Sequence, residues 1–560
     1  MRKLINNPKH VVREMLEGLS DLNPNLAIFS NENIVFQANL ITQKNEVAVI
    51  SGGGGGHEPA HAGYVGTGML HAAVSGDVFT SPSTDSILAT IRASTGAKGA
   101  LLIVMNYTGD RLNFGLAAEL ARAEGFLVEI VVVGDDVALR DVVAKERSRG
   151  IAGTILVSKV AGALAASGAD LASVTAAAQY AAANVATMGV ALGSCTIPGV
   201  GKPSFELPAG QIELGLGIHG EKGCQRINQT SADELCAIML DKIITELKLS
   251  AQDSVAVLIN GLGATPPMEL AIVVRGTLAN LRQRGIKVER AFSGNFMTSL
   301  EMPGCSISLL RLNPQLLSAL DYPVQTAAWV NAGKIAAQRL IYQAPILLTP
   351  ENIPNDLPLN PNLKQIGLKI ASALEQAETR LTELDSAAGD GDLGLSMCRG
   401  ASAIRELPDA AWSNEVNMLN SIGEALRKAI AGSSGPFYAT GLFRAARYLT
   451  TQESVNALSL AEAFVIAVNA VSELGGAKLN DRTMYDALYP AASTFKQALL
   501  AGETPARAWH LAVNAAENGA QLTAQMLPKL GRASYLGERA LGIPDAGAAA
   551  VVVWLKAILI

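Results

Sequence analysis

Val-Ala-Val-Ile-Ser-Gly-Gly-Gly-Gly-Gly-His-Glu-Pro, residues 47–59, takes an apolar run straight into five glycines. The pattern predicts a strand over 47–50 that opens into a loop whose backbone amides a small ligand can touch, with His57 beside it. A flexible surface loop is the alternative. It is not a dinucleotide-binding fingerprint, because no helical pattern follows at once and Pro59 interrupts the chain.

Similar apolar runs recur through the first half of the chain. Each is bounded by Gly, Asp or Asn, and Ala-rich helical stretches lie between several of them. Strands that alternate with helices predict an α/β domain over 1–339 with much parallel pairing. The Asn-Tyr-Thr-Gly-Asp segment at 106–110 follows one of these strands, so it and the glycine loop are expected to share a pocket at strand carboxyl ends. The further runs lie at 101–104, 128–133, 155–157 and 255–259.

The residue pattern of the chain changes after about residue 340. Five prolines between 345 and 361 exclude a helix interior or a central strand, so 340–362 is predicted to be a stiff, extended linker. Beyond it, 363–560 lacks a convincing strand run until its last residues. Apolar residues recur there at helical spacing, which predicts an all-α domain of several antiparallel helices. The clearest stripe is Val416, Leu419, Ile422, Leu426 and Ile430.

The composition limits the compartment and the partners. The chain has 560 residues, 49% of them hydrophobic and 17% charged, with a net charge of −6. This balance gives no electrostatic footprint for nucleic acid or an anionic membrane. Five scattered cysteines without a CxxC pair fit a reducing cytoplasm. The N-terminus has no apolar signal core, and no uninterrupted apolar run is long enough to suggest a membrane span.

Three aspartates fall within eight residues, at Asp385, Asp390 and Asp392, with no Lys or Arg among them. Their mutual repulsion and hard oxygen ligands favour a bound Mg²⁺ or Ca²⁺, and Mg²⁺ commonly keeps positions open for substrate phosphates. We expect this cluster at the first helix–loop–helix junction of the helical domain. A helix-capping acidic loop is the alternative. An EF-hand fails, because the twelfth position from Asp390 is Ala401 and not Glu.

Further glycine-rich loops follow at 431–435, 474–478 and 545–547, the second leading into Asp-Arg-Thr-Met at 481–484. Each alone fits an ordinary helix C-cap. Together with the aspartate loop they favour a ring of phosphate and base contacts. No Walker A sequence occurs, so any nucleotide binding is not of the P-loop kind.

His219 is the last candidate, in the segment Gly-Leu-Gly-Ile-His-Gly-Glu at 215–221. A neutral imidazole that is approached between glycines is able to act as a nucleophile or base. A structural histidine is the alternative.

These motifs together resemble the dihydroxyacetone kinase family in its single-chain ATP-dependent form, over nearly the whole chain. The resemblance is carried by the motifs Gly-Gly-Gly-Gly-Gly-His-Glu-Pro-Ala-His-Ala-Gly-Tyr (52–64), Phe-Thr-Ser-Pro (79–82), Asn-Tyr-Thr-Gly-Asp-Arg-Leu-Asn-Phe (106–114), Gly-Lys-Pro-Ser-Phe (201–205), Gly-Ile-His-Gly-Glu (217–221), Gly-Asp-Gly-Asp (389–392), Asp-Arg-Thr-Met (481–484) and Gly-Arg-Ala-Ser-Tyr-Leu-Gly-Glu-Arg (531–539).

For the first half, the resemblance implies a two-lobed α/β substrate domain. It implies that His219 adds to the substrate ketone and holds it as a covalent hemiaminal, that Asp110 is the base, and that His57 hydrogen-bonds the substrate. Pocket residues by the same resemblance are Gly54, Gly55, Gly56 and Ser81.

For the second half, the resemblance implies a barrel of eight helices in which Asp385, Asp390 and Asp392 hold two Mg²⁺ ions on the ATP phosphates. It also implies a homodimer in which one subunit's nucleotide domain serves another's substrate domain. The implied nucleotide contacts are Leu393, Gly394, Leu395, Ser396, Ser433, Ser434, Gly475, Thr483, Met484, Arg532, Asp545, Ala546 and Gly547.

Two positions depart from the family pattern. Met105 stands where many members have Lys, which removes a positive charge near the substrate hydroxyls. Asn480 replaces a Gly, and because Asn tolerates a left-handed turn, we expect that loop to be retained.

The resemblance predicts ATP-dependent phosphorylation of dihydroxyacetone. The alternatives are a kinase for another short sugar such as glyceraldehyde or erythrulose, cleavage of FAD to cyclic FMN, and a non-enzymatic carbonyl-sensing regulator. Two halves on one chain favour ATP over a phosphocarrier protein as the phosphate donor.

Overall fold

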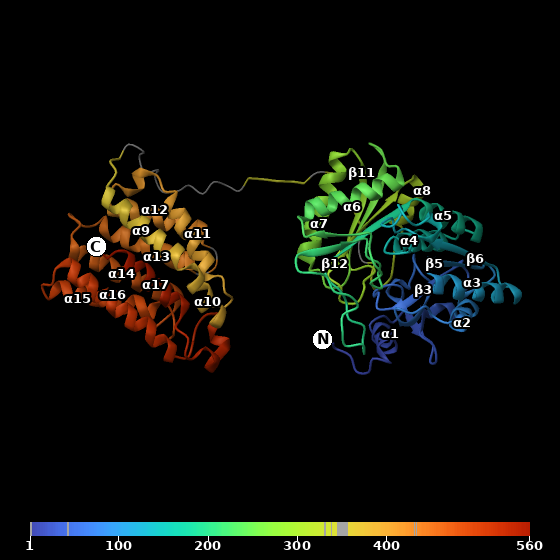
Figure 1. Cartoon of the computed structure of the whole chain (residues 1–560), viewed down its shortest axis with the longest axis horizontal. Coiled ribbons are helices and arrows are strands. Elements are labelled where there is room, and N and C mark those ends of the chain that lie inside the picture. The colour runs from blue at the N-terminus through green and yellow to red at the C-terminus, as the bar shows by residue number, and fades with distance from the viewer. Residues whose placement is uncertain are drawn as a thin grey trace. The chain divides into compact units, whose positions relative to one another are not determined.

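The computed structural model describes residues 3–41, 44–329, 332–337, 339–343, 357–430, 432 and 434–559. The chain divides into two compact units, Met1–Ile341 and Tyr342–Ile560 (Figure 1). The predicted linker at 340–362 falls largely on residues 344–356, which lie outside the described residues. Its boundaries therefore stay predictions.

Two six-stranded sheets form the frame of the first unit, in the orders β1-β2-β4-β3-β5-β6 and β11-β10-β12-β7-β8-β9. Parallel pairing joins β4, β3, β5 and β6, and also β10 and β11, whereas the rest of the second sheet is antiparallel. The strands are β1 (Leu26–Ile28), β2 (Ile34–Gln37), β3 (Ala48–Gly55), β4 (Ala72–Val78), β5 (Ala100–Met105), β6 (Val128–Val133), β7 (Val185–Ala191), β8 (Gln211–Leu214), β9 (Gln225–Asn228), β10 (Ser254–Gly261), β11 (Lys287–Gly294) and β12 (Gly304–Arg311).

Helices cover both sheets. Two of them, α2 and α3, pack on one face of the first sheet, and α6 and α7 pack on the second sheet. The largest core holds α4 and α5 together with residues of both sheets. The helices are α1 (Val11–Asp21), α2 (Thr84–Ser94), α3 (Thr108–Ala123), α4 (Thr154–Ala166), α5 (Leu171–Ala183), α6 (Ala232–Leu247), α7 (Pro267–Gln283) and α8 (Pro314–Asp321).

One predicted strand is wrong. Residues 155–157 lie in α4, where almost every residue is buried. A helix that is enclosed on all sides has no polar face, so its apolar run resembles a buried strand.

The glycine run also differs from its prediction. The strand β3 does not end at Ile50 but continues through Ser51 and four glycines to Gly55. These glycines pair in parallel with β4, and a Cβ on Gly52 would lie 2.3 Å from the Val74 carbonyl oxygen. The run is therefore an extended strand in close backbone packing, and the loop begins at Gly56.

The described residues of the second unit form helices and no strand, which confirms the predicted all-α domain. Eight helices pack in a closed ring: α9, α11, α12, α13, α14, α15, α16, α17 and back to α9. The bounds are α9 (Pro361–Gln376), α10 (Glu378–Ala388), α11 (Leu393–Arg405), α12 (Glu415–Ala429), α13 (Ser434–Leu449), α14 (Ala457–Gly475), α15 (Tyr485–Leu500), α16 (Pro505–Leu522) and α17 (Ala546–Ala557).

The aspartate cluster was expected at the first helix junction of this unit, but it lies at the second. The helices α9 and α10 are separated only by Ala377. No loop-forming stretch in the sequence marks this additional helix end. Asp385 lies in α10, and Asp392 is the N-cap residue of α11.

One helix, α14, is long and apolar enough to cross a membrane by length and composition alone. In this structure it is a member of the ring, and Ala461, Val468 and Val471 on it belong to a buried core.

Candidate active site

The loop between β8 and β9 carries His219. Its Nδ1 lies 2.8 Å from Oε1 of Glu221, and Oε2 of the same carboxylate accepts the His219 backbone N–H at 2.9 Å. Burial raises the pKa of Glu221, but the hydrogen bonds and charge of His219 outweigh it and lower the pKa to about 2. An ionised Glu221 accepts a proton from Nδ1, which leaves Nε2 with the free lone pair.

His57 follows the glycine strand and is 1% exposed. Its Nδ1 donates to the carbonyl oxygen of Thr298 at 2.8 Å, and Nε2 has no hydrogen-bond partner among the described residues. Burial lowers the pKa of His57 to about 3, so the ring is neutral and Nε2 is an acceptor. The same segment of the second lobe holds the His219 loop, because the Ser299 hydroxyl donates to the Ile218 carbonyl.

Asp110 lies in the first turn of α3, immediately after the carboxyl end of β5. It is 5% exposed, and no described residue hydrogen-bonds its Oδ1. Burial raises the pKa of Asp110, against a hydrogen bond with Ser81 and the charge of His219. The group is thus a buried carboxylate with one free oxygen, as a general base requires.

Three aromatic rings surround the His219 imidazole. The ring centroids of Tyr107, His57 and Phe79 lie 4.7, 4.9 and 5.2 Å from it. Such contacts fix the plane of a side chain without using its nitrogen atoms.

The predicted pocket glycines are closely packed, and Gly54 and Gly56 lie against Phe79 of this centre. Gly56 has φ of +95°, and a Cβ there would lie 2.9 Å from the Phe79 ring. A Cβ on Gly54 would meet Thr80 N at 2.6 Å, and one on Gly55 would meet Val12 at 2.7 Å. Met105, at the end of β5, is buried, and its methyl group lies 3.0 Å from a Cβ built on Gly53. Gly54, Gly55 and Gly56 therefore accept no side chain unless a neighbouring group shifts.

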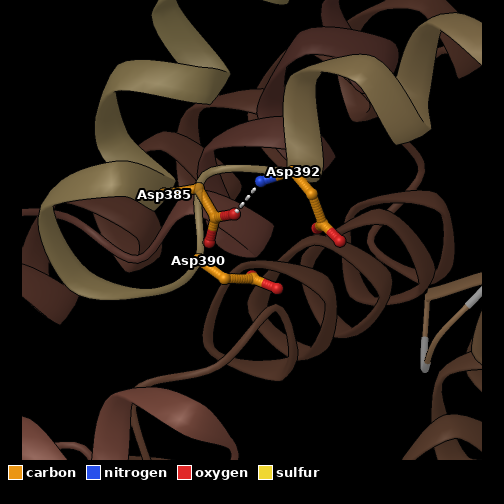
Figure 2. A group of neighbouring side chains, drawn as sticks. All are labelled: Asp385, Asp390 and Asp392. Atoms are coloured by element: carbon orange, nitrogen blue, oxygen red, sulfur yellow. Dashed lines mark hydrogen bonds between the residues drawn. The ribbon is translucent and has the colours of Figure 1, made fainter. Parts of the chain in front are cut away.

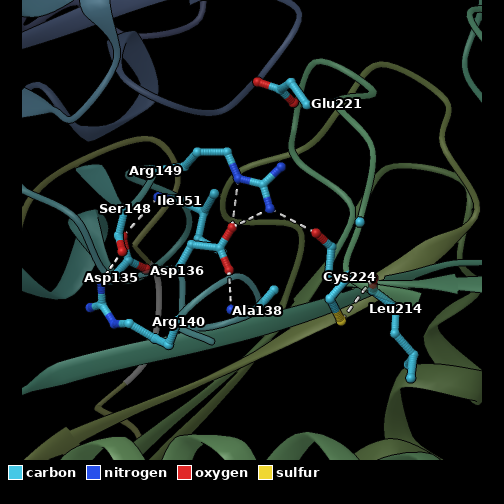
Figure 3. Close-up of polar contacts among 12 residues, drawn as sticks. Asp135, Asp136, Ala138, Arg140, Ser148, Arg149, Ile151, Leu214, Glu221 and Cys224 are labelled. Carbon is cyan, nitrogen blue, oxygen red and sulfur yellow. Dashed lines mark hydrogen bonds and ion pairs between the residues drawn. The ribbon is translucent and has the colours of Figure 1, made fainter. Parts of the chain in front are cut away.

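A pair of charges lies behind the His219 loop. The guanidinium of Arg149 contacts the carboxylate of Asp136 at 2.6 Å and donates to the carbonyl oxygen of Gly215 at 2.7 Å (Figure 3). No motif in the sequence marks this pair.

In the second unit, the carboxylates of Asp385, Asp390 and Asp392 each offer an oxygen, and these oxygens lie within 4.8 Å of one another (Figure 2). Oδ2 of Asp385 accepts the backbone N–H groups of Asp392 and Leu393 at 2.9 and 3.2 Å. Three hard oxygen donors so close together fit a divalent cation such as Mg²⁺.

A cavity of about 390 Å³ adjoins these aspartates and brings the four glycine loops together. Its lining includes the predicted residues Asp385, Asp390, Asp392, Leu393, Ser396, Ser434, Gly475, Thr483, Met484, Asp545, Ala546 and Gly547.

Four predicted nucleotide contacts are not among these lining residues. Gly394 packs against α10, where a Cβ would lie 2.1 Å from Thr382 Oγ1, and Leu395 is 48% exposed. Ser433 and the side chain of Arg532 lie outside what the structure describes.

Arg482, for which the sequence predicts no role, also lines the cavity. It is 1% exposed, has φ of +60°, and donates to the carbonyl oxygens of Ala540 and Ile543. Asn480 nearby has φ of +69°, the left-handed turn expected there.

Comparison with known proteins agrees with this arrangement. A Dak1 domain matches residues 17–328, and a DAK2 domain matches residues 387–559. A putative 3,4-dihydroxy-2-butanone kinase of Solanum lycopersicum is 43% identical over 99% of this chain and 97% of its own length. The Homo sapiens triokinase/FMN cyclase is 40% identical over 100% and 99%.

A solved structure gives the same result for the fold. The dihydroxyacetone kinase from C. freundii, in complex with AMP-PNP and Mg²⁺, is 36% identical, covers 100% of this chain and 99% of its own, and has a TM-score of 0.66. With both domains matched and relatives similar over their whole length, the chain belongs to the single-chain dihydroxyacetone kinase family.

Proposed function

We propose that this protein is a kinase that transfers the γ-phosphate of ATP to a hydroxyl group of dihydroxyacetone. One observation carries the proposal: His219 has Nδ1 on Glu221, which leaves Nε2 free in a site where Nε2 of His57 and Oδ1 of Asp110 have no described partner. A nucleophile, an acceptor and a base are thus available to a small polyhydroxy ketone.

The first step is addition of His219 to the ketone. The Nε2 lone pair forms a bond to the carbonyl carbon, and the carbonyl π electrons move to the oxygen, which takes up a proton from solvent. The ring then carries a positive charge, and Glu221 offsets it through the Nδ1 proton. An alcohol such as glycerol has no carbonyl group, so the covalent step rejects it.

Phosphoryl transfer uses a free hydroxyl of the bound ketose. Asp110 accepts the hydroxyl proton, the oxygen forms a bond to the γ-phosphorus, and the bond from that phosphorus to the ADP oxygen breaks. The raised pKa of Asp110 supports this role, because a more basic carboxylate is the better proton acceptor.

Asp385, Asp390 and Asp392 are proposed to hold Mg²⁺, which neutralises phosphate charge when bound. The glycine loops around the adjoining cavity leave room for phosphate oxygens to approach backbone N–H groups. We assign the nucleotide to this cavity.

A coupled ADP-release assay with Mg-ATP tests the proposal across dihydroxyacetone, glyceraldehyde, erythrulose and 3,4-dihydroxy-2-butanone. ADP release above background is expected with dihydroxyacetone, and its absence would exclude the assignment. The His219→Ala variant should form no covalent adduct by intact mass spectrometry. An adduct without ADP release would favour the alternative of a non-enzymatic, carbonyl-sensing regulator. The sugar that gives the fastest ADP release identifies the natural substrate class.

A second candidate activity is cleavage of FAD to cyclic FMN. It is favoured by the 40% identity, over full length, to a relative named triokinase/FMN cyclase. Phosphorus NMR of a reaction with FAD and Mn²⁺ would show the cyclic phosphodiester. We expect this activity to depend on Asp392 and to survive His219→Ala.

We also propose a cytoplasmic homodimer. Light scattering on the purified chain should give twice its mass of 58.3 kDa, and a single-chain mass would contradict the dimer.

A further inference from the structure

The ion pair behind the His219 loop is held by several hydrogen bonds (Figure 3). Nη2 of Arg149 lies 2.6 Å from Oδ2 of Asp136, and Nε donates to the same oxygen at 2.8 Å. The two side chains are 13% and 3% exposed. Oδ1 of Asp136 accepts the backbone N–H of Ala138 at 2.9 Å. The carboxylate is held on both oxygens, so the guanidinium it binds has one orientation.

From this pair, Arg149 reaches the loop at 215–221. Nη2 donates to the Gly215 carbonyl oxygen, and Nη1 faces Gly217. A Cβ added to Gly217 would lie 2.6 Å from Nη1 and 2.1 Å from Oε2 of Glu221. The cation and the carboxylate therefore flank the same glycine. Burial lowers the pKa of Arg149, but the charges of Asp136 and Glu221 raise it, and the net shift is upward.

Tyr107 lies against the imidazole and close to these charges. Its ring lies 4.7 Å from that of His219, and its buried hydroxyl has no partner in the described part of the chain. Burial raises the pKa of Tyr107. The charges of Glu221 and Asp136 raise this pKa further, and that of Arg149 lowers it. The imidazole, the tyrosine and the ion pair are thus close neighbours.

We propose that Arg149, fixed by Asp136, is a positioning residue for His219. It holds the loop at Gly215 and flanks Glu221 across Gly217, so that the carboxylate stays directed at Nδ1 and Nε2 keeps the lone pair. The consequence for adduct formation rests on the proposed function of His219. Arg149 acts only through Glu221 and the loop.

Two variants disturb this arrangement in different ways. Arg149→Met removes the cation, whereas Gly217→Ala keeps every charge and places a methyl group between Arg149 and Glu221. Arg149→Lys keeps the charge without the two-pronged contact. Each should lower the rate of adduct formation with dihydroxyacetone in the full chain, by about tenfold for Met and Ala and by less for Lys.

The matched controls alter comparable groups away from His219. Arg290 lies on β11, at the opposite edge of the sheet from β8 and β9, and contacts Asp321 at 2.7 and 2.6 Å, so Arg290→Met also leaves a fixed carboxylate without its cation. Gly115 has nothing within 4 Å of an added Cβ, so Gly115→Ala adds a methyl group harmlessly. Both controls should keep the wild-type rate.

A second readout needs no substrate. The chain has six histidines, so ¹⁵N spectra of the histidine-labelled protein resolve few rings. Wild type should show His219 protonated at Nδ1, and Arg149→Met and Gly217→Ala should show both tautomers.

The outcomes separate the two proposals. If wild type forms no adduct, the proposed function fails, and the tautomer alone decides the role of Arg149. If Arg149→Met and Gly217→Ala keep the Nδ1–H tautomer and the wild-type rate, the inference is overturned. It is also overturned if Arg290→Met loses the adduct equally, because the effect would then be general destabilisation.

Discussion

Oε1 of Glu221 lies 2.8 Å from Nδ1 of His219, and the other carboxylate oxygen accepts the backbone N–H of the same histidine. One side chain therefore fixes both the ring and the backbone of the proposed nucleophile. A single glycine separates the two residues in the sequence, so the interaction lies entirely within the loop.

Glu221→Gln should slow adduct formation with dihydroxyacetone by about tenfold or more. The amide keeps the shape but not the charge that stabilises the imidazolium, and hydrogen bonds to charged groups contribute about 1.5–3 kcal/mol. Intact mass spectrometry after rapid mixing measures the rate. The exposed Glu206→Gln is the control, and an unchanged rate in Glu221→Gln would contradict the role.

The first unit should lose stability in mild acid. Burial lowers the pKa of His57 from 6.5 to about 3 and that of His61 to about 4. Both histidines are neutral when folded and take up protons when unfolded, so their contribution is fully present above pH 6.5 and is lost as the pH falls toward 4. Each lowers the free energy of unfolding by up to about 1.4 kcal/mol per pH unit in that window.

Amide hydrogen exchange tests this prediction. After correction for the intrinsic rate, exchange in β3 should accelerate between about pH 7 and about pH 5, and His61→Gln should reduce the acceleration. The helix α15, in a unit whose described histidine is exposed, serves as the internal control. Equal acceleration of β3 in wild type and His61→Gln would refute the assignment to His61.

The local features of these sites could be predicted from the sequence, but the contacts between distant segments could not. Helical stripes and strands that end in glycine follow from periodicity, and Asp385, Asp390 and Asp392 are close in sequence. The helix α4 is enclosed on all sides, so its sequence shows no alternation of apolar and polar residues. Its apolar run at 155–157 was therefore wrongly predicted to be a strand.

The supporting residues of the His219 site come from other elements. Thr298 and Arg149 are brought to the site only by the pairing of the two lobes, and neither stands in a recognisable motif. Packing of segments remote in sequence leaves no local pattern, so these contacts became visible only in the folded chain.

Asp392→Asn and Asp385→Asn should both weaken Mn²⁺ binding, by about tenfold to a hundredfold. They should differ in their effect on the loop, because Oδ2 of Asp385 also accepts two backbone N–H groups at the start of α11. Isothermal titration gives the metal affinity, and hydrogen exchange over 389–394 gives the loop. Faster exchange is expected for Asp385→Asn, and equal exchange in the two variants would contradict the second role.

Met105→Lys tests whether the apolar residue at the end of β5 sets the choice of sugar. Met105 is 1% exposed and lies against Gly53, near His61. An ammonium group there loses its hydration, so the free energy of unfolding should fall by about 2–4 kcal/mol. Where a substrate hydroxyl accepts from it, the KM for dihydroxyacetone should fall relative to that for 3,4-dihydroxy-2-butanone. Met105→Leu conserves volume and should change stability by less than about 1.5 kcal/mol and leave the KM ratio unchanged. An equal ratio in all three proteins would show that this position does not contribute to selection of the sugar.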